Sequence, residues 1–309
     1  MDLSFNNIAV TMTAILVTMV AGLAALVSIQ TPSKEASESA YLPDLNKQPS
    51  KYAYEMFALV YTPIWIFFFA IVVIFQLYEH FDAFTYNTFL GVLALPLILQ
   101  PLIFPSAGFN SPDQHRPFWE RYSTKANIWI AVYSFIGNYW YTHYFYSVLK
   151  AEYTMPATRL NNVPICMFFA THFYFTTYHA ISNALLRKVV TTHEAGLPRV
   201  ALFCSVVLVF SYFTAFMETL SISSFPYYSF ENRDMAYTVG SAFYGIYFFV
   251  SFPGFYSFDD EIDSTANEKR HVTAWDTFVS SCGHGMMILT LLDLVRLYLD
   301  IPLVVGTLP

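Results

Sequence analysis

The chain has 309 residues, of which 56% are hydrophobic and only 12% charged. A soluble domain normally carries about 25% charged residues, so this composition excludes an ordinary soluble protein. The net charge of -7 gives no reason to expect a nucleic-acid partner. Repeated apolar runs predict an all-α fold, a polytopic helical bundle in a membrane.

Eight apolar runs are long enough to cross a bilayer as helices, which takes about 20 residues. The first is too long for the core of a signal peptide, so we interpret it as a retained span. A polar linker follows it. We therefore expect residues 1–51 to form an additional helix with a linker, and residues 52–309 to form a seven-helix membrane domain. The expected spans cover about residues 8–29, 54–78, 84–104, 126–149, 163–186, 200–223, 237–255 and 275–299.

Basic residues are distributed unevenly between the loops. Most of the 15 Lys and Arg residues fall in the loops after the first, third, fifth and seventh expected spans. Cytoplasmic loops are enriched in these residues, so the asymmetry supports the count of eight and places both termini on the lumenal or exterior side. This orientation also converts sequence position into membrane depth, at about 1.5 Å per helical residue.

Polar residues recur along the expected fifth span. His172, Thr176, His179 and Asn183 are spaced by four, three and four residues, so at about 100° per residue they share one helical face. Hydrocarbon cannot satisfy such groups, so the stripe must face other helices or a cavity. Both a structural hydrogen bond between helices and a functional role are open for the two histidines.

Ionisable residues from three expected spans fall at a similar depth, toward the lumenal end: His143, Glu218, Asp293 and Arg296. Glu218 has no basic neighbour within one helical turn, and an intramembrane carboxyl group of this kind is a functional candidate by default. The alternative is a tertiary salt bridge to Arg296. Asp293 and Arg296 are three residues apart, so they can also form a local ion pair.

Known cofactor motifs are missing from the sequence. It contains no HxxxH, HExxH, GxGxxG or Walker motif, and its histidines and cysteines do not cluster. We therefore expect no metal and no redox cofactor. An enzyme that acts on an apolar ligand, a transporter and a receptor remain as classes of function.

Several ordered segments carry a resemblance to a known family. They include Trp119–Ile130, Gly137–Phe145, Tyr178–Asn183, Ser211–Thr219, Tyr247–Pro253 and Leu292–Leu297. In these segments the chain resembles the plant-type cycloeucalenol cycloisomerases, also called cyclopropylsterol isomerases. The similarity runs from about Tyr61 to Leu299, whereas residues 8–29 and the linker after them look like an addition to the plant pattern.

The resemblance implies a reaction in sterol biosynthesis, at the endoplasmic reticulum. The family opens the 9β,19-cyclopropane ring of a 4α-methyl sterol, as in the conversion of cycloeucalenol to obtusifoliol. A proton must be added to C19, positive charge develops near C9, and a proton leaves C8. The net change is an isomerisation, so no redox cofactor is needed. A sterol substrate, membrane lipids and other sterol-biosynthetic membrane enzymes are the expected partners, and cycloartenol is an alternative substrate.

Our catalytic hypothesis matches this chemistry to the polar residues. We expect Glu218 to donate the proton, alone or with Asp293. We expect His172 or His143 to orient the acid or to take the proton from C8. Arg296 could instead hold Glu218 as an anion, which would disqualify Glu218 as the acid.

The remaining candidates are assigned to substrate binding. His179 and Asn183 are expected to hydrogen-bond the 3β-hydroxyl group. The other candidates are expected to face the developing cation or to contact the sterol: Asn138, Trp140, Tyr244, Tyr247 and Arg296.

Two functions other than catalysis stay open. A non-catalytic membrane protein that binds or transports sterols or lipids would need the pocket but not the acid. A proton-coupled carrier of a small solute would use the same carboxyl group and histidines, but it is at odds with the family resemblance.

Overall fold

A computed structural model describes residues 3–33, 40–222, 225–231, 236–265 and 271–305. The described chain is mostly helical, which confirms the predicted class. Each predicted apolar run lies in a long helical segment. The long α-helices are α1 (Leu3–Ser28), α2 (Pro49–Ile74), α3 (Ala83–Ile103), α4 (Tyr122–Ile136), α6 (Ile165–Thr192), α7 (Leu197–Ile222), α9 (Ser241–Tyr256) and α10 (Ala274–Tyr298).

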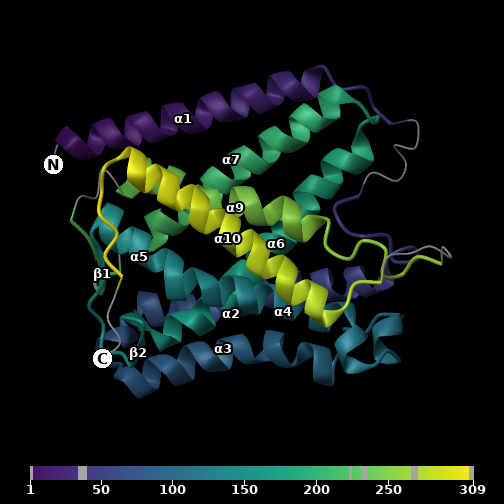
Figure 1. Cartoon of the computed structure of the whole chain (residues 1–309), viewed down its shortest axis with the longest axis horizontal. Helices are drawn as coiled ribbons and strands as arrows, with labels where there is room; N and C mark the ends of the chain where they lie inside the picture. Colours follow the sequence, from purple (N-terminus) through teal and green to yellow (C-terminus); the bar gives the residue numbers. More distant parts are fainter. Residues whose placement is uncertain (1–2, 34–39, 223–224, 232–235, 266–270, 306–309) are drawn as a thin grey trace.

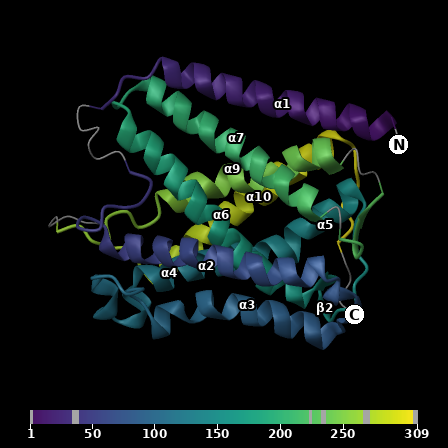
Figure 2. The same ribbon diagram turned by 180° about the vertical axis from the view of Figure 1, so that it is seen from behind.

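The helices form a bundle with α4 and α6 at its centre. Helix α6 packs against α2, α3, α4, α7 and α9, and α10 packs against α4 and α9. Helix α1 lies beside α7 along one edge of the bundle, and α3 lies along the opposite edge (Figures 1 and 2). The polar stripe predicted in the fifth span therefore lies on a central helix, where neighbouring helices can satisfy it.

Two of the helical segments are interrupted by π-helical turns. Helix α4 continues through η5 (Gly137–Tyr141), α5 (Thr142–Tyr144) and η6 (Phe145–Leu149), and η7 (Ala236–Gly240) leads into α9. A π-helical turn changes which side chains share a face, and such turns often occur at functional sites. All three turns contribute to the cavity described below.

Two short antiparallel strand pairs lie together at one end of the bundle (Figure 1). Strand β1 (Ala151–Tyr153) pairs with β4 (Tyr228–Phe230), with Glu152 opposite Ser229. Strand β2 (Arg159–Leu160) pairs with β3 (Val163–Pro164). The first pair joins two loops that are far apart in the sequence, and it covers the end of the bundle that holds the cavity.

Among the described residues, five helices are long and apolar enough to cross a membrane: Val10–Ser28, Pro49–Ile74, Ala83–Ile103, Leu197–Ser221 and Ala274–Tyr298. The predicted count of eight spans is therefore not confirmed. The other three predicted spans coincide with α4, α6 and α9. The π-helical turns shorten α4 and α9 as regular α-helices, and α6 carries the polar stripe.

A buried ion pair joins α2 to α6. The two nitrogens at the tip of the Arg187 guanidinium group lie 2.7 and 2.8 Å from the two carboxylate oxygens of Glu55. Asn183 donates a third hydrogen bond to this carboxylate, at 2.9 Å. The side chain of Glu55 is fully buried, so the carboxylate depends on these partners for its stability inside the bundle.

Candidate active site

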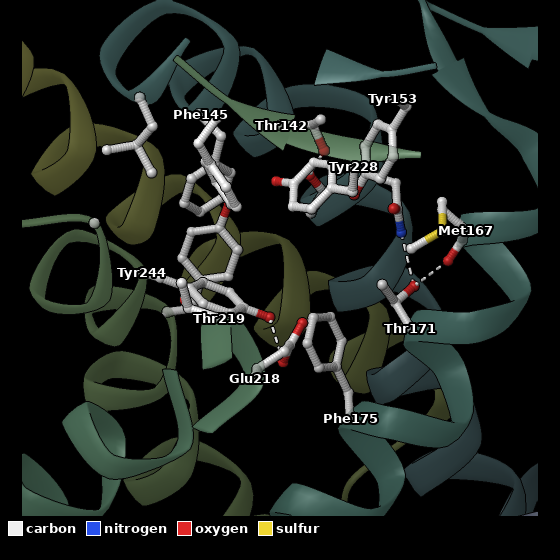
Figure 3. Close-up of a pocket in the computed structure, with 16 residues that line it drawn as sticks. Thr142, Phe145, Tyr153, Met167, Thr171, Phe175, Glu218, Thr219, Tyr228 and Tyr244 are labelled. Carbon is white, nitrogen blue, oxygen red and sulfur yellow. Dashed lines mark hydrogen bonds between the residues drawn. The ribbon is translucent and has the colours of Figure 1, made fainter. Parts of the chain in front are cut away.

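A cavity lies between α4, α6, α7 and α9, beneath the β1–β4 strand pair (Figure 3). Its volume is about 80 Å³. Side chains from all four helical segments and from both strands line it. They include Asn138, Thr142, Phe145, Tyr153, Thr171, Phe175, Glu218, Tyr228, Tyr244 and Tyr247.

Glu218 projects from α7 into this cavity (Figure 3). Its carboxyl oxygen Oε2 accepts a hydrogen bond of 2.9 Å from the hydroxyl group of Tyr244 on α9. Tyr178 of α6 is a second hydrogen-bond partner of the same carboxyl group. Both partners are neutral donors, and within the described chain no cation forms an ion pair with Glu218. The carboxyl group can therefore exchange a proton without breaking a salt bridge.

Asp293 and Arg296 form the local ion pair that the sequence allowed. The guanidinium group of Arg296 lies 2.7 Å from the carboxylate of Asp293 and donates to the carbonyl oxygen of Ile301 at 2.8 Å. Neither residue lines the cavity. The alternative salt bridge between Arg296 and Glu218 is not formed, so Arg296 does not hold Glu218 as an anion.

The two histidines expected to assist Glu218 lie elsewhere. The Nε2 atom of His172 is 3.0 Å from Oδ1 of Asn127, and His172 lines a separate groove along α4. The buried ring of His143 packs against Tyr146, with ring centroids 5.5 Å apart. Neither histidine lines the cavity. Depth along the helices was therefore insufficient to predict a contact with Glu218.

The residues expected to bind a hydroxyl group have partners inside the bundle. His179 hydrogen-bonds through Nδ1 to the carbonyl oxygen of Phe175 at 2.7 Å, and through Nε2 to the hydroxyl group of Ser251 at 2.9 Å. Asn183 donates to Glu55. Neither residue lines the cavity. For both residues, structural hydrogen bonds within the bundle account for the observed contacts.

Aromatic rings form one wall of the cavity. Tyr244 and Tyr247 line it, and their ring centroids lie 4.9 Å apart in an edge-to-face arrangement. The ring of Phe145 lies 5.4 Å from that of Tyr244 and 5.7 Å from that of Tyr247. Trp140 does not line the cavity, and 43% of it is exposed. Two of the three predicted aromatic candidates are thus at the site.

Neutral polar groups line another part of the cavity. Asn138 donates hydrogen bonds from Nδ2 to the hydroxyl group of Thr171 at 2.7 Å and to the carbonyl oxygen of Ser134 at 2.8 Å. Sequence reasoning found Asn138 but missed Thr171, which lies directly before His172. It also missed Tyr153 and Tyr228, whose rings stack 4.4 Å apart. Tyr153 and Tyr228 come together because strands β1 and β4 pair, and no local sequence pattern predicts that pairing.

A metal site is not formed by the part of the chain that the structure describes. No group of three or more His, Cys, Asp or Glu side chains there could hold a metal ion.

Comparison with known proteins identifies a relative over most of the chain. Cycloeucalenol cycloisomerase of Arabidopsis thaliana is 40% identical over 271 residues, which cover 85% of this chain and 92% of the relative. No protein-family model matches the chain. No solved structure matches it either.

Proposed function

The chain belongs to the cycloeucalenol cycloisomerase family, and we propose that it is a sterol isomerase that opens the 9β,19-cyclopropane ring of a 4α-methyl sterol. The observation that supports a catalytic role is the Glu218 carboxyl group, which faces a cavity, hydrogen-bonds to Tyr244 and has no ion-pair partner among the described residues. A protein that only binds or carries sterols would not need such an acid.

Glu218 is the proposed proton donor. Among the described residues no cation offsets a negative charge on this carboxyl group, so we assign it the protonated form in the resting protein. A protonated carboxyl group that faces an apolar ligand can act as a general acid. Tyr244 is the proposed positioning residue, because its hydroxyl group fixes one carboxyl oxygen at 2.9 Å.

The proposed reaction uses one carboxyl group twice. The Glu218 proton forms a bond to C19 while the bond between C9 and C19 breaks, which leaves positive charge near C9. The proton at C8 then leaves, and its bonding electrons form the double bond to C9. Glu218 is the only acidic residue among the described cavity-lining residues, so its carboxylate is the simplest acceptor for the C8 proton. This returns the acid to its starting form and needs no redox cofactor.

The aromatic wall is proposed to stabilise the developing cation. The rings of Phe145, Tyr244 and Tyr247 pack edge-to-face or tilted against one another at the cavity lining. A cation near the face of an aromatic ring is stabilised by about 0.5–2 kcal/mol, with the larger values in desolvated sites. A site that is poor in water also prevents capture of the cation by water.

Sterol binding requires the cavity to widen. Ligand pockets for small molecules usually have about 300–1,000 Å³, whereas this cavity has about 80 Å³. The stacked rings of Tyr153 and Tyr228 belong to the short strands that cover it. We propose that these two residues move aside to admit the sterol. Asn138 and Thr171 are then the proposed partners of its hydroxyl group, in place of His179 and Asn183.

The membrane arrangement is proposed as well. We propose that all eight long helical segments cross the membrane and that α4, α6 and α9 use their apolar neighbours to shield their polar residues. Residues 1–51 are the proposed addition to a seven-helix catalytic domain. An endoplasmic-reticulum location, and association with other membrane enzymes of sterol biosynthesis, would follow from the proposed reaction.

Turnover of cycloeucalenol tests the proposed function. Membranes that contain the full-length protein should convert cycloeucalenol to its Δ8 isomer, and membranes without the protein should not. The same assay with cycloartenol would define the preferred substrate. Sterol binding without conversion of either compound would instead support a binding or transport protein.

Replacing Tyr244 by Phe should lower kcat by about tenfold to a hundredfold and change KM little. The Tyr244 hydroxyl group hydrogen-bonds to the negatively charged carboxylate that forms as Glu218 gives up its proton, and a hydrogen bond to a charged group contributes about 1.5–3 kcal/mol. The matched control is Tyr61→Phe, which removes a hydroxyl group that donates to the carbonyl oxygen of Leu93 at 2.7 Å, away from the cavity. Equal effects of the two variants on kcat would exclude a positioning role for Tyr244. Initial rates over a range of sterol concentrations separate kcat from KM.

A further inference from the structure

A second cavity lies along α4, before the residues of this helical segment that line the Glu218 cavity. It is a groove between α3, α4 and α6, lined also by Phe118 and Trp119 of the segment that leads into α4, and its volume is about 400 Å³. This falls within the range of about 300–1,000 Å³ that is usual for small-molecule pockets. Helix α3 lies at the edge of the bundle (Figure 1), so the groove is near the outer surface.

The groove is elongated, and most of its lining is apolar. Along α4 the lining runs from Thr124 to Phe135, which corresponds to about 16 Å at 1.5 Å per residue. Aromatic rings from α6 and from the segment before α4 complete it, including Phe168 and Trp119. Trp119 is 63% exposed, so it lies at the mouth of the groove and not in the core.

Two buried hydroxyl groups of the groove have no hydrogen-bond partner in the part of the chain that the structure describes. Thr124 and Ser134 both line the groove and are only 3% and 2% exposed. Neither hydroxyl oxygen is hydrogen-bonded to any residue that the structure describes. A buried hydroxyl group without a partner costs about 1–3 kcal/mol. Rotation about the Cα–Cβ bond can turn either hydroxyl group toward a ligand that supplies the missing hydrogen bond.

The polar groups of the groove are all uncharged. Besides the two hydroxyl groups, they are the amide of Asn127 and the ring of His172, which are hydrogen-bonded to each other at 3.0 Å. The lining contains no Lys, Arg, Asp or Glu among the described residues. The guanidinium group of the nearby Arg121 donates to the carbonyl oxygens of Arg116 and Pro101. An anionic headgroup or a carboxylate would therefore be buried without a counter-charge, which is costly.

We propose that this groove is a second binding site, for a neutral polycyclic lipid that carries a hydroxyl group, that is, for a sterol. The ring system lies between the aromatic and aliphatic walls, and the sterol hydroxyl group bonds to Ser134 or Thr124. This site is separate from the Glu218 cavity, and it does not depend on catalysis there. His172 and Asn127, which the proposed reaction does not use, line this second site.

Photolabelling of the full-length protein in lipid nanodiscs tests this site. The probe is a neutral hydroxysterol with a diazirine on its ring system, and labelled peptides are mapped by mass spectrometry. Labels are expected within residues 118–135 and on residues 168–169. Ala131→Trp should fill the groove and lower this labelling at least tenfold, while labels on α7 and α9 around the Glu218 cavity persist. Equal groove labelling in Ala131→Trp would overturn the proposal.

A second variant removes the hydroxyl groups without filling the groove. Ser134→Ala combined with Thr124→Val should weaken sterol labelling of the groove roughly threefold to tenfold, because one hydrogen bond contributes about 0.5–1.5 kcal/mol. Unlabelled sterol should compete with the probe. Competition by excess phosphatidylcholine but not by sterol would identify an acyl-chain surface and contradict the proposal. Labelling of both sites without any turnover would contradict the proposed function alone.

Discussion

Replacing Glu218 by Gln is expected to lower turnover by about 10²–10⁴-fold, the usual contribution of a general acid. The amide has nearly the same shape as the carboxyl group and can still accept the hydrogen bond from Tyr244. It cannot give a proton to carbon under these conditions. The fold and sterol binding should therefore persist. The measurement is the initial rate of Δ8-sterol formation, with equal amounts of folded protein.

The matched control for this variant is Glu152→Gln. Glu152 lies on β1 at the same end of the bundle, but its side chain is exposed and does not line the cavity. Its replacement should leave the rate within about twofold of the wild type, because exposed substitutions away from a site have small effects. A Glu218→Gln protein that keeps more than a tenth of the wild-type rate would remove Glu218 from the mechanism.

Replacing Arg187 by Met is expected to destabilise the bundle by about 3–5 kcal/mol, because it leaves the buried carboxylate of Glu55 without its cation. The ion pair joins α2 to α6 through two contacts of 2.7 and 2.8 Å. The loss of stability is measured by thermal unfolding in detergent. The readout is the fraction of protein that stays monodisperse. Activity should fall in proportion to the amount of folded protein.

A double-mutant cycle separates the lost ion pair from lost packing. Glu55→Met combined with Arg187→Met removes both charges, so it should be less destabilising than Arg187→Met alone. Arg199→Met is the charge control, because Arg199 donates to the backbone carbonyl oxygens of Val190 and His193 and not to a carboxylate. Additive effects in the cycle would show that Glu55 and Arg187 are not energetically coupled.

The helices could be predicted from sequence because each apolar run has a length and composition that favour a membrane helix. The expected sixth span, about 200–223, corresponds to α7 at Leu197–Ile222, and the eighth, about 275–299, to α10 at Ala274–Tyr298. The number of spans was harder to predict. Helix α6 is long enough to cross a membrane, but its polar stripe makes it ambiguous by composition.

The candidate site was predicted in part, because sequence position gives depth in a bundle but not direction around a helix axis. Glu218, Tyr244 and Tyr247 do meet at one cavity. His143 and Asp293 were expected at a similar depth to Glu218, yet neither lines that cavity. The packing of whole helices decides which side chains face one another, and a single sequence does not contain that information in a local pattern.

The missing part of the site comes from irregular structure. The π-helical turns at Gly137–Tyr141 and Phe145–Leu149 rotate the following side chains relative to a regular helix. They contribute Asn138 and Phe145 to the cavity. Tyr153 and Tyr228 meet through a strand pair only three residues long. Neither the π-helical turns nor the short strand pair has a strong sequence signal, so the positions of these residues are known only from the fold.

In the proposed mechanism, a solvent-exchangeable acid of this protein opens the cyclopropane ring. The most direct test is to incubate membranes containing the full-length protein with cycloeucalenol in D2O and to analyse the sterols by mass spectrometry. We predict a Δ8 product with one deuterium in the new C19 methyl group, since the carboxyl group of Glu218 should exchange its proton with water when the sterol leaves. A Δ8 product without deuterium at C19, or a bound sterol that stays unchanged, would contradict the proposed mechanism.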